Sequence, residues 1–189
     1  SPPGAVWRGT AATAAWAQQY NAHAAAPSNT AVLTYKKDNT RTGQNVNETT
    51  LNTSNVTSSQ FGKRVAYPVN GAVYAEPLYD PGVTIGGAIH NVVFVATQHD
   101  SIYAFDADQT TATAPLWQTS FINTAKNIKT VSSADVTCND ITPEMGITGT
   151  PTIDPATGTL YVVVNTNENG TIIYRLHALD ITTGKDVAG

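Results

Sequence analysis

Four short apolar runs between Ala72 and Phe121 decide the fold expected for this chain. They read Ala-Val-Tyr-Ala-Glu-Pro-Leu-Tyr-Asp-Pro (72–81), His-Asn-Val-Val-Phe-Val-Ala-Thr (90–97), Ser-Ile-Tyr-Ala-Phe-Asp-Ala-Asp (101–108) and Pro-Leu-Trp-Gln-Thr-Ser-Phe (115–121). β-Branched and aromatic residues dominate each run, and Gly, Pro, Asp and Asn separate the runs, which is typical of strands joined by turns. A four-stranded antiparallel meander of this kind is one blade of a β-propeller.

A second, looser copy of this unit follows. Asp80-Pro81 and Asp154-Pro155 lie 74 residues apart, and the same spacing separates Asp106 from Asp180. The interior does not keep that spacing, so we expect extra loop residues at 83–89 in the first copy and at 165–170 in the second. Insertions that move between loops while the strands persist are typical of structural repeats, and a chance recurrence of short motifs is the alternative.

The predicted architecture is all-β: a partial β-propeller of about two four-stranded antiparallel blades, preceded by a short N-terminal arm. We divide the chain into five parts: an arm, helical or irregular, at 1–30; a lead-in segment with a closing-type strand at 31–71; the first blade at 72–121; a long inter-blade loop at 122–147; and a second, incomplete blade at 148–189. Strands are expected near 32–35, 64–69, 72–80, 91–97, 101–106, 116–121, 149–154, 159–165 and 172–180, and a short helix near 52–58. Because a propeller closes with about four to eight blades, the remaining blades or neighbouring copies of the chain are the expected partners.

Composition excludes some classes of partner. Only 13% of the residues are charged, the net charge is −4, and no cluster of basic residues occurs, so nucleic acid is not an expected partner. No apolar run approaches the roughly 20 residues of a membrane span. The abundance of Thr, Asn, Ala and Gly suits the surface of a secreted or cell-envelope protein.

A family resemblance appears around the first blade. Tyr35-Lys-Lys-Asp-Asn-Thr-Arg-Thr-Gly-Gln-Asn resembles the opening of quinoprotein-like propellers, which carry pyrroloquinoline quinone (PQQ)-type repeats. Tyr103-Ala-Phe-Asp-Ala, and more closely His177-Ala-Leu-Asp followed by Thr183-Gly-Lys, resemble the end of that repeat. The resemblance implies the fold and says little about activity, since many such propellers carry no quinone.

One departure from the family bears on function. Quinone-dependent alcohol dehydrogenases of this superfamily hold their cofactor beside a disulfide between adjacent cysteines, whereas Cys138 is the only cysteine here. We therefore expect a non-catalytic extracellular or envelope propeller that binds protein or glycan, with no cofactor. A PQQ-dependent alcohol or sugar dehydrogenase, with PQQ and calcium and with most cofactor residues outside this chain, is the alternative.

Candidate ligand-face residues lie in two loops. One is the turn Gln98-His99-Asp100, and the other is the long connection after Phe121, which contains Asp140 and Glu144. Connections this long are often functional, so we expect a ligand near His99, Asp100, Asp140 and Glu144, while ordinary solvated loop residues are the alternative interpretation.

No catalytic residue and no metal site is assigned from the sequence. The four histidines lack a zinc-ligand spacing, and His177 is expected to pack within a strand. Asp154 to Gly158 and Asp180 to Gly184 share the form Asp-x-x-x-Gly, which favours a turn capped by the Asp side chain over a calcium loop.

Overall fold

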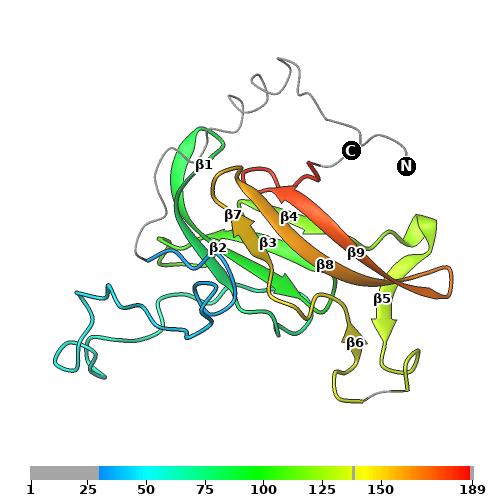
Figure 1. Cartoon of the computed structure of the whole chain (residues 1–189), viewed down its shortest axis with the longest axis horizontal. Helices are drawn as coiled ribbons and strands as arrows, with labels where there is room; N and C mark the ends of the chain where they lie inside the picture. Colours follow the sequence, from blue (N-terminus) through cyan, green and yellow to red (C-terminus); the bar gives the residue numbers. More distant parts are fainter. Residues whose placement is uncertain (1–29, 138, 188–189) are drawn as a thin grey trace, which may run out of the picture.

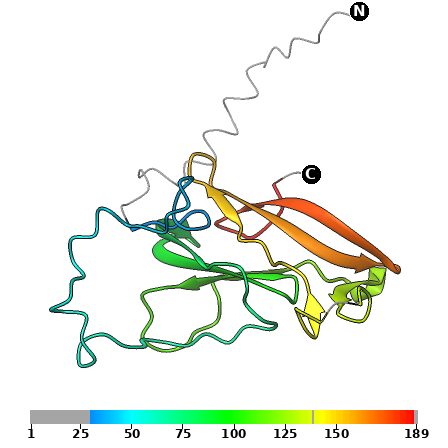
Figure 2. The ribbon, with the colours of Figure 1, turned by 60° about the horizontal axis from the view of Figure 1, so that its bottom comes forward.

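The computed structural model describes residues 30–137 and 139–187 and shows an all-β protein built from two antiparallel sheets. The first sheet has the order β1-β2-β3-β4 and consists of β1 (Leu78–Ile85), β2 (Ala88–Thr97), β3 (Ser101–Asp106) and β4 (Trp117–Ser120). The second contains β5 (Ile128–Ser132), β6 (Glu144–Met145), β7 (Thr152–Asp154), β8 (Thr159–Glu168) and β9 (Thr171–Asp180), and the 3-10 helix η1 (Thr124–Lys126) precedes it. Figures 1 and 2 show the sheets as two layers, with β8 and β9 lying over the first sheet.

β8 is the central strand of the second sheet. It pairs with β9 along its whole length, with β7 at its beginning and with β5 at its end, while β6 pairs only with β5. Residues 152–180 thus repeat the meander order of β1, β2 and β3, and an isolated bridge between Leu179 and Asp186 adds a fourth pairing beyond β9.

The core lies between the two sheets. Side chains alternate across each strand, so one face of the first sheet and one face of the second meet in a single apolar cluster. The members of this cluster that are at most 2% exposed include Leu78, Val92, Phe94, Ile102, Ile147, Leu160, Val162, Val164, Leu179 and Ile181. Burying such side chains contributes about 1.5–3 kcal/mol each, which makes this interface the main source of stability.

A tryptophan joins the sheets at one end of the core. Trp117 on β4 donates its indole N–H to the carbonyl oxygen of Ile181, at 2.8 Å, and Thr119 donates its hydroxyl to the carbonyl oxygen of Gly184, at 2.6 Å. Gly184 has a φ of +69°, and a Cβ atom there would lie 2.5 Å from Cε3 of Trp117. The last strand of the first sheet is therefore fitted against the turn that follows β9.

The strands expected from residue 72 onward are present with shifted bounds, and the long connection after Phe121 was wrongly treated as a loop. The third strand matches at 101–106, but the first begins at Leu78 rather than at Ala72, and residues 122–147 contain η1, β5 and β6. Residues 83–89 and 165–170 are not loop insertions either. They extend the β1–β2 and β8–β9 hairpins, which turn at Gly86-Gly87 and at Asn169-Gly170, where the φ angles are positive.

The lead-in segment differs from its prediction. No strand forms at 64–69, at 32–35 only Val32 forms a bridge, to Tyr79, and the expected helix near 52–58 is a series of turns. Pro68 lacks the N–H that a ladder needs, and the segment is held by side chains instead. Tyr67 stacks on Phe105 with ring centroids 4.4 Å apart and donates its hydroxyl to the carbonyl oxygen of Asp106, so it covers the outer face of the first sheet.

The two Asp-x-x-x-Gly segments form the expected capped turns. The carboxylate of Asp154 accepts the N–H of Ala156, and that of Asp180 accepts the N–H of Thr182, at 3.0 and 2.7 Å. Gly158 and Gly184 close these turns with φ values of +63° and +69°. The turn interpretation is confirmed.

The predicted N-terminal arm falls almost wholly on residues 1–29, outside the described part of the chain. Among residues 30–137 and 139–187 no helix has the length and apolar character needed to cross a membrane.

Candidate functional site

The candidate site is built on the turn between β2 and β3. Thr97 pairs with Ser101, so Gln98, His99 and Asp100 form a three-residue hairpin loop. Such a loop needs a left-handed residue at its third position, and Asp100 takes this role with a φ of +47°. Asp tolerates this conformation better than bulky residues do, which explains why this sequence turns here.

Two neighbouring segments hold the loop in place. The carbonyl oxygen of Ala72 accepts the N–H of Gln98 at 2.8 Å, and the carbonyl oxygen of Asp100 accepts the N–H of Phe121 at 2.9 Å. Gly71, with a φ of +78°, lies so close to the loop that a Cβ atom would be 2.6 Å from the backbone nitrogen of His99. The turn is therefore part of the packed protein and not a free surface loop.

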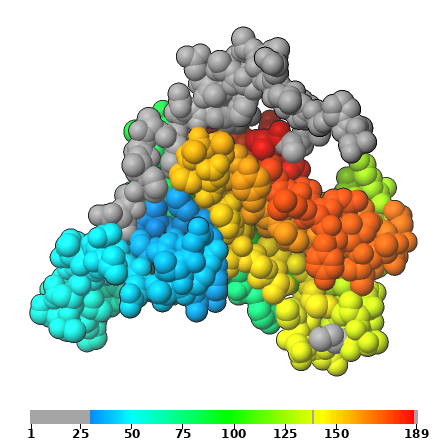
Figure 3. Space-filling view, in the orientation of Figure 1, coloured from blue at the N-terminus to red at the C-terminus, as the bar shows by residue number. Residues whose placement is uncertain are grey.

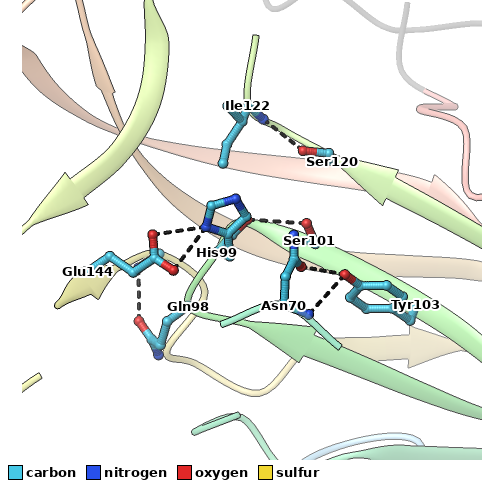
Figure 4. A network of polar contacts seen from close by, with 9 residues as sticks. Asn70, Gln98, His99, Ser101, Tyr103, Ser120, Ile122 and Glu144 are labelled. Carbon is cyan, nitrogen blue, oxygen red and sulfur yellow. Dashed lines mark hydrogen bonds and ion pairs between the residues drawn. The ribbon is translucent and has the colours of Figure 1, made fainter. Parts of the chain in front are cut away.

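His99 and Glu144 form the centre of the site (Figure 4). Nδ1 of His99 lies 2.9 Å from both carboxylate oxygens of Glu144, which is delivered by β6. A carboxylate accepts hydrogen bonds, so Nδ1 carries the proton and Nε2 remains available to a ligand or to a transferable proton. The His99 side chain is 38% exposed.

Gln98 positions the strand that carries Glu144. Its side chain is buried, its oxygen accepts the N–H of Gly146 at 2.8 Å, and its amide nitrogen donates to the carbonyl oxygen of Ile147 at 3.2 Å. Thr148 also contacts this amide through its hydroxyl. A buried amide with both ends satisfied fixes the distance between the turn and β6, and it thereby places Glu144 against His99.

Asp100 lies beneath this pair. It is fully buried, and neither carboxylate oxygen has a hydrogen-bond partner among the described residues. Burial, with a smaller contribution from the charge of Glu144, raises the pKa of Asp100 to about 8. Gly146 leaves the room that this side chain occupies, since a Cβ atom at Gly146 would lie 2.4 Å from Oδ1 of Asp100. The site therefore holds a carboxyl group that is protonated at neutral pH.

The structure brings together three of the four candidate residues. His99, Asp100 and Glu144 are adjacent, whereas Asp140 is exposed and makes no hydrogen bond or ion pair within residues 30–137 and 139–187. Two close-packed glycines, Gly71 and Gly146, and the buried Gln98 complete the site, and sequence reasoning missed their roles. Nothing in their local sequence signals those roles, because each depends on a segment about 30–50 residues away.

The other acidic residues near the turns are used structurally. The carboxylate of Asp106 accepts the N–H of Asp108 and the side-chain amide of Gln109, both at 2.9 Å, and His90 contacts it at 3.0 Å. These hydrogen bonds, the one from the Asp108 N–H first, lower the pKa of Asp106. Within the described ranges no three His, Cys, Asp or Glu side chains are arranged to hold a metal ion, and Cys138 lies outside them.

Comparisons with known proteins add no further assignment. No protein-family model matches the chain, and neither the curated proteins nor the solved structures contain a significant match.

Proposed function

We propose that this chain is a non-catalytic scaffold of the extracellular space or cell envelope, built from consecutive β-propeller-type blades, which binds a protein or glycan at the loops around His99 and Glu144. The observation that carries the proposal is the repeated construction of the two sheets. Both contain a three-stranded meander whose third strand ends at an Asp, and the Asp carboxylate accepts the N–H two residues later, at Asp106 and at Asp180.

The way in which the two sheets pack supports a stack to which further sheets could be added. One face of the first sheet packs into the core. At its edge, the Trp117 indole N–H donates a hydrogen bond to the turn after β9. In a stack of equivalent units, the outer face of the second sheet would make the corresponding contact with a following sheet.

That outer face is apolar and exposed. Tyr161 and Val163 on β8, and Tyr174 and Leu176 on β9, are 40%, 50%, 69% and 69% exposed. Val163 pairs with Leu176, and the register places Tyr161 and Tyr174 on the same face, so the four side chains form one patch, which we call the β8–β9 patch. Figure 3 views this side of the molecule, where β8 and β9, in orange, form the surface. Contiguous exposed apolar surface of this kind marks an interaction site.

The exposed β8–β9 patch leads us to a testable prediction about self-association. We expect the 189-residue chain to self-associate with rising concentration in light scattering, because none of the residues that the structure describes covers the patch. A Tyr174→Lys/Leu176→Lys variant should be monodisperse. Val46 and Leu51 are also exposed, at 81% and 51%, but lie outside the patch, so the Val46→Lys/Leu51→Lys variant should still associate. A monodisperse wild-type chain would contradict the stacking proposal.

The non-catalytic assignment has its own test. After incubation with PQQ and calcium, we expect no dye-linked oxidation of alcohols or sugars by the chain. Robust turnover would contradict the scaffold assignment and show a quinone-dependent dehydrogenase. The His99–Glu144 pair would then be the first residues to substitute, since an imidazole held by a carboxylate is suited to proton transfer.

A further inference from the structure

A recess of about 230 Å³ lies between the sheets, beside the far half of the β8–β9 hairpin. Its apolar lining consists of Phe121, Ile128 and Val164, and its polar lining includes Thr166, Glu168 and Arg175. The recess exists because the hairpin is longer than the sheet opposite it. β8 and β9 have ten residues each, whereas β4 has only four, so the inner face of the hairpin beyond Val164 extends past the first sheet.

The polar side of the recess is an ion pair with unused hydrogen-bonding capacity. Oε1 of Glu168 accepts the hydroxyl of Thr166 at 3.0 Å, and the same oxygen pairs with Nη1 of Arg175. Within the described residues, Oε2 of Glu168 and the remaining guanidinium N–H groups make no hydrogen bond. An acceptor and several donors are thus presented side by side, with their charges already compensated.

The apolar side is held in place before any ligand binds. The ring of Phe121 packs on His177 with centroids 4.4 Å apart, and Nδ1 of His177 lies 3.1 Å from a carboxylate oxygen of Asp186. The backbone N–H of Phe121 is bonded to the carbonyl oxygen of Asp100, so this wall is continuous with the turn that carries His99. A rigid wall reduces the entropy lost when a ligand binds.

We infer that this recess binds a single neutral sugar ring. A pyranose has a C–H face that can lie against Phe121 and Val164, and a rim of hydroxyls that both donate and accept, as Glu168 and Arg175 require. The volume lies below the roughly 300 Å³ at which pockets for drug-sized ligands begin, so one ring fits better than an extended chain. An organic anion is disfavoured because Glu168 lies beside Arg175 and would repel it.

This inference rests on the proposed binding function and narrows it to a ligand class and a second site. Glucose, galactose, mannose and N-acetylglucosamine should be titrated into the ¹⁵N-labelled chain and followed by NMR. We expect at least one to bind with a Kd on the order of 1 mM, as suits about a dozen ligand atoms in an open site. The Arg175→Gln and Thr166→Val variants should weaken binding by about tenfold, since each loses or loosens a polar partner.

Lys129→Gln is the matched control, because it also removes a positive charge, and Lys129 is an exposed residue that follows the recess residue Ile128 on β5 without lining the recess, so it should leave the Kd within about twofold. Thermal melts of each variant check that it is folded. No sugar binding up to roughly 50 mM, or binding that both Arg175→Gln and Thr166→Val leave unchanged, would overturn the inference. So would tighter binding of small organic carboxylates than of any sugar. Each of these results leaves the light-scattering test of the stacked scaffold untouched, so the two proposals fail separately.

Discussion

Replacing Gly184 by Ala is expected to destabilise the protein by about 3 kcal/mol or more. Two effects add. Gly184 has a φ of +69°, where a Cβ atom is strained, and that atom would lie 2.5 Å from Cε3 of Trp117 and 2.6 Å from the Thr119 hydroxyl oxygen. The Trp117 ring is 8% exposed and held by its hydrogen bond to Ile181, so it cannot move aside without opening the contact between the sheets. Urea denaturation followed by far-UV circular dichroism measures the loss.

Gly43 offers a control that separates strain from crowding. Its φ is +70°, and a Cβ atom there would have nothing within 4 Å. Gly43→Ala should therefore cost only about 1 kcal/mol, from the backbone alone. In a Trp117→Phe background the smaller ring leaves room, so the cost of Gly184→Ala should fall toward that of Gly43→Ala. Strict additivity of Gly184→Ala and Trp117→Phe would show that the two residues are not packed as described.

Replacing Asp100 by Asn is expected to remove a pH dependence of stability between about pH 4 and pH 8. The folded-state pKa of Asp100 is raised from 3.8 to about 8 by burial and by Glu144. Within this window the folded protein keeps a proton that the unfolded chain has released, so the free energy of unfolding falls as the pH rises. The contribution is complete below about pH 4 and is lost by about pH 8, with a size on the order of 5 kcal/mol.

Asn is a neutral side chain of the same shape, so the Asp100→Asn variant should match wild type near pH 4 and exceed its stability increasingly toward pH 8. Urea titrations across this range measure the difference. Asp140→Asn, which removes an exposed carboxylate, is the control variant. If the Asp100→Asn and wild-type profiles run parallel, Asp100 is not the buried acid described above.

The raised pKa of Asp100 also has a consequence for the surface. The Asp100 carboxyl group is buried, so the groups offered to a ligand are the Glu144 carboxylate and the imidazole of His99. Ionisation of Asp100 above about pH 8 would place a negative charge beneath this pair.

Much of the fold was predictable from local patterns. Alternation of apolar and polar residues, with turn residues between the runs, located β3 within its bounds and most of β2, β8 and β9, because a strand with one buried face must alternate, but it covered only residues 78–80 of β1. The Asp-x-x-x-Gly turns at 154–158 and 180–184 were also predictable, since an Asp side chain bonds to backbone two residues away without any help from the rest of the fold.

Local patterns failed where long-range contacts decide the outcome. The sequence of residues 64–69 is typical of a strand. In the structure, however, the Tyr67 ring stacks on Phe105, and Pro68 has no N–H to donate to a neighbouring strand. β5 and β6 lie in a segment too polar to suggest strands, and they form because β8 extends far enough for Lys129 and Thr130 to pair with it.

For the candidate site, local turn chemistry was enough to predict a tight turn at His99 and Asp100. The packed structure was needed to show that Glu144 reaches His99 while Asp140 does not, and that burial raises the pKa of Asp100. Those outcomes depend on Gln98 binding Gly146 across 48 residues, on room left by the missing side chain of Gly146, and on the exclusion of water from Asp100. Distances between residues far apart in sequence, and the burial that shifts a pKa, are properties of the packed core, and a short stretch of sequence does not contain them.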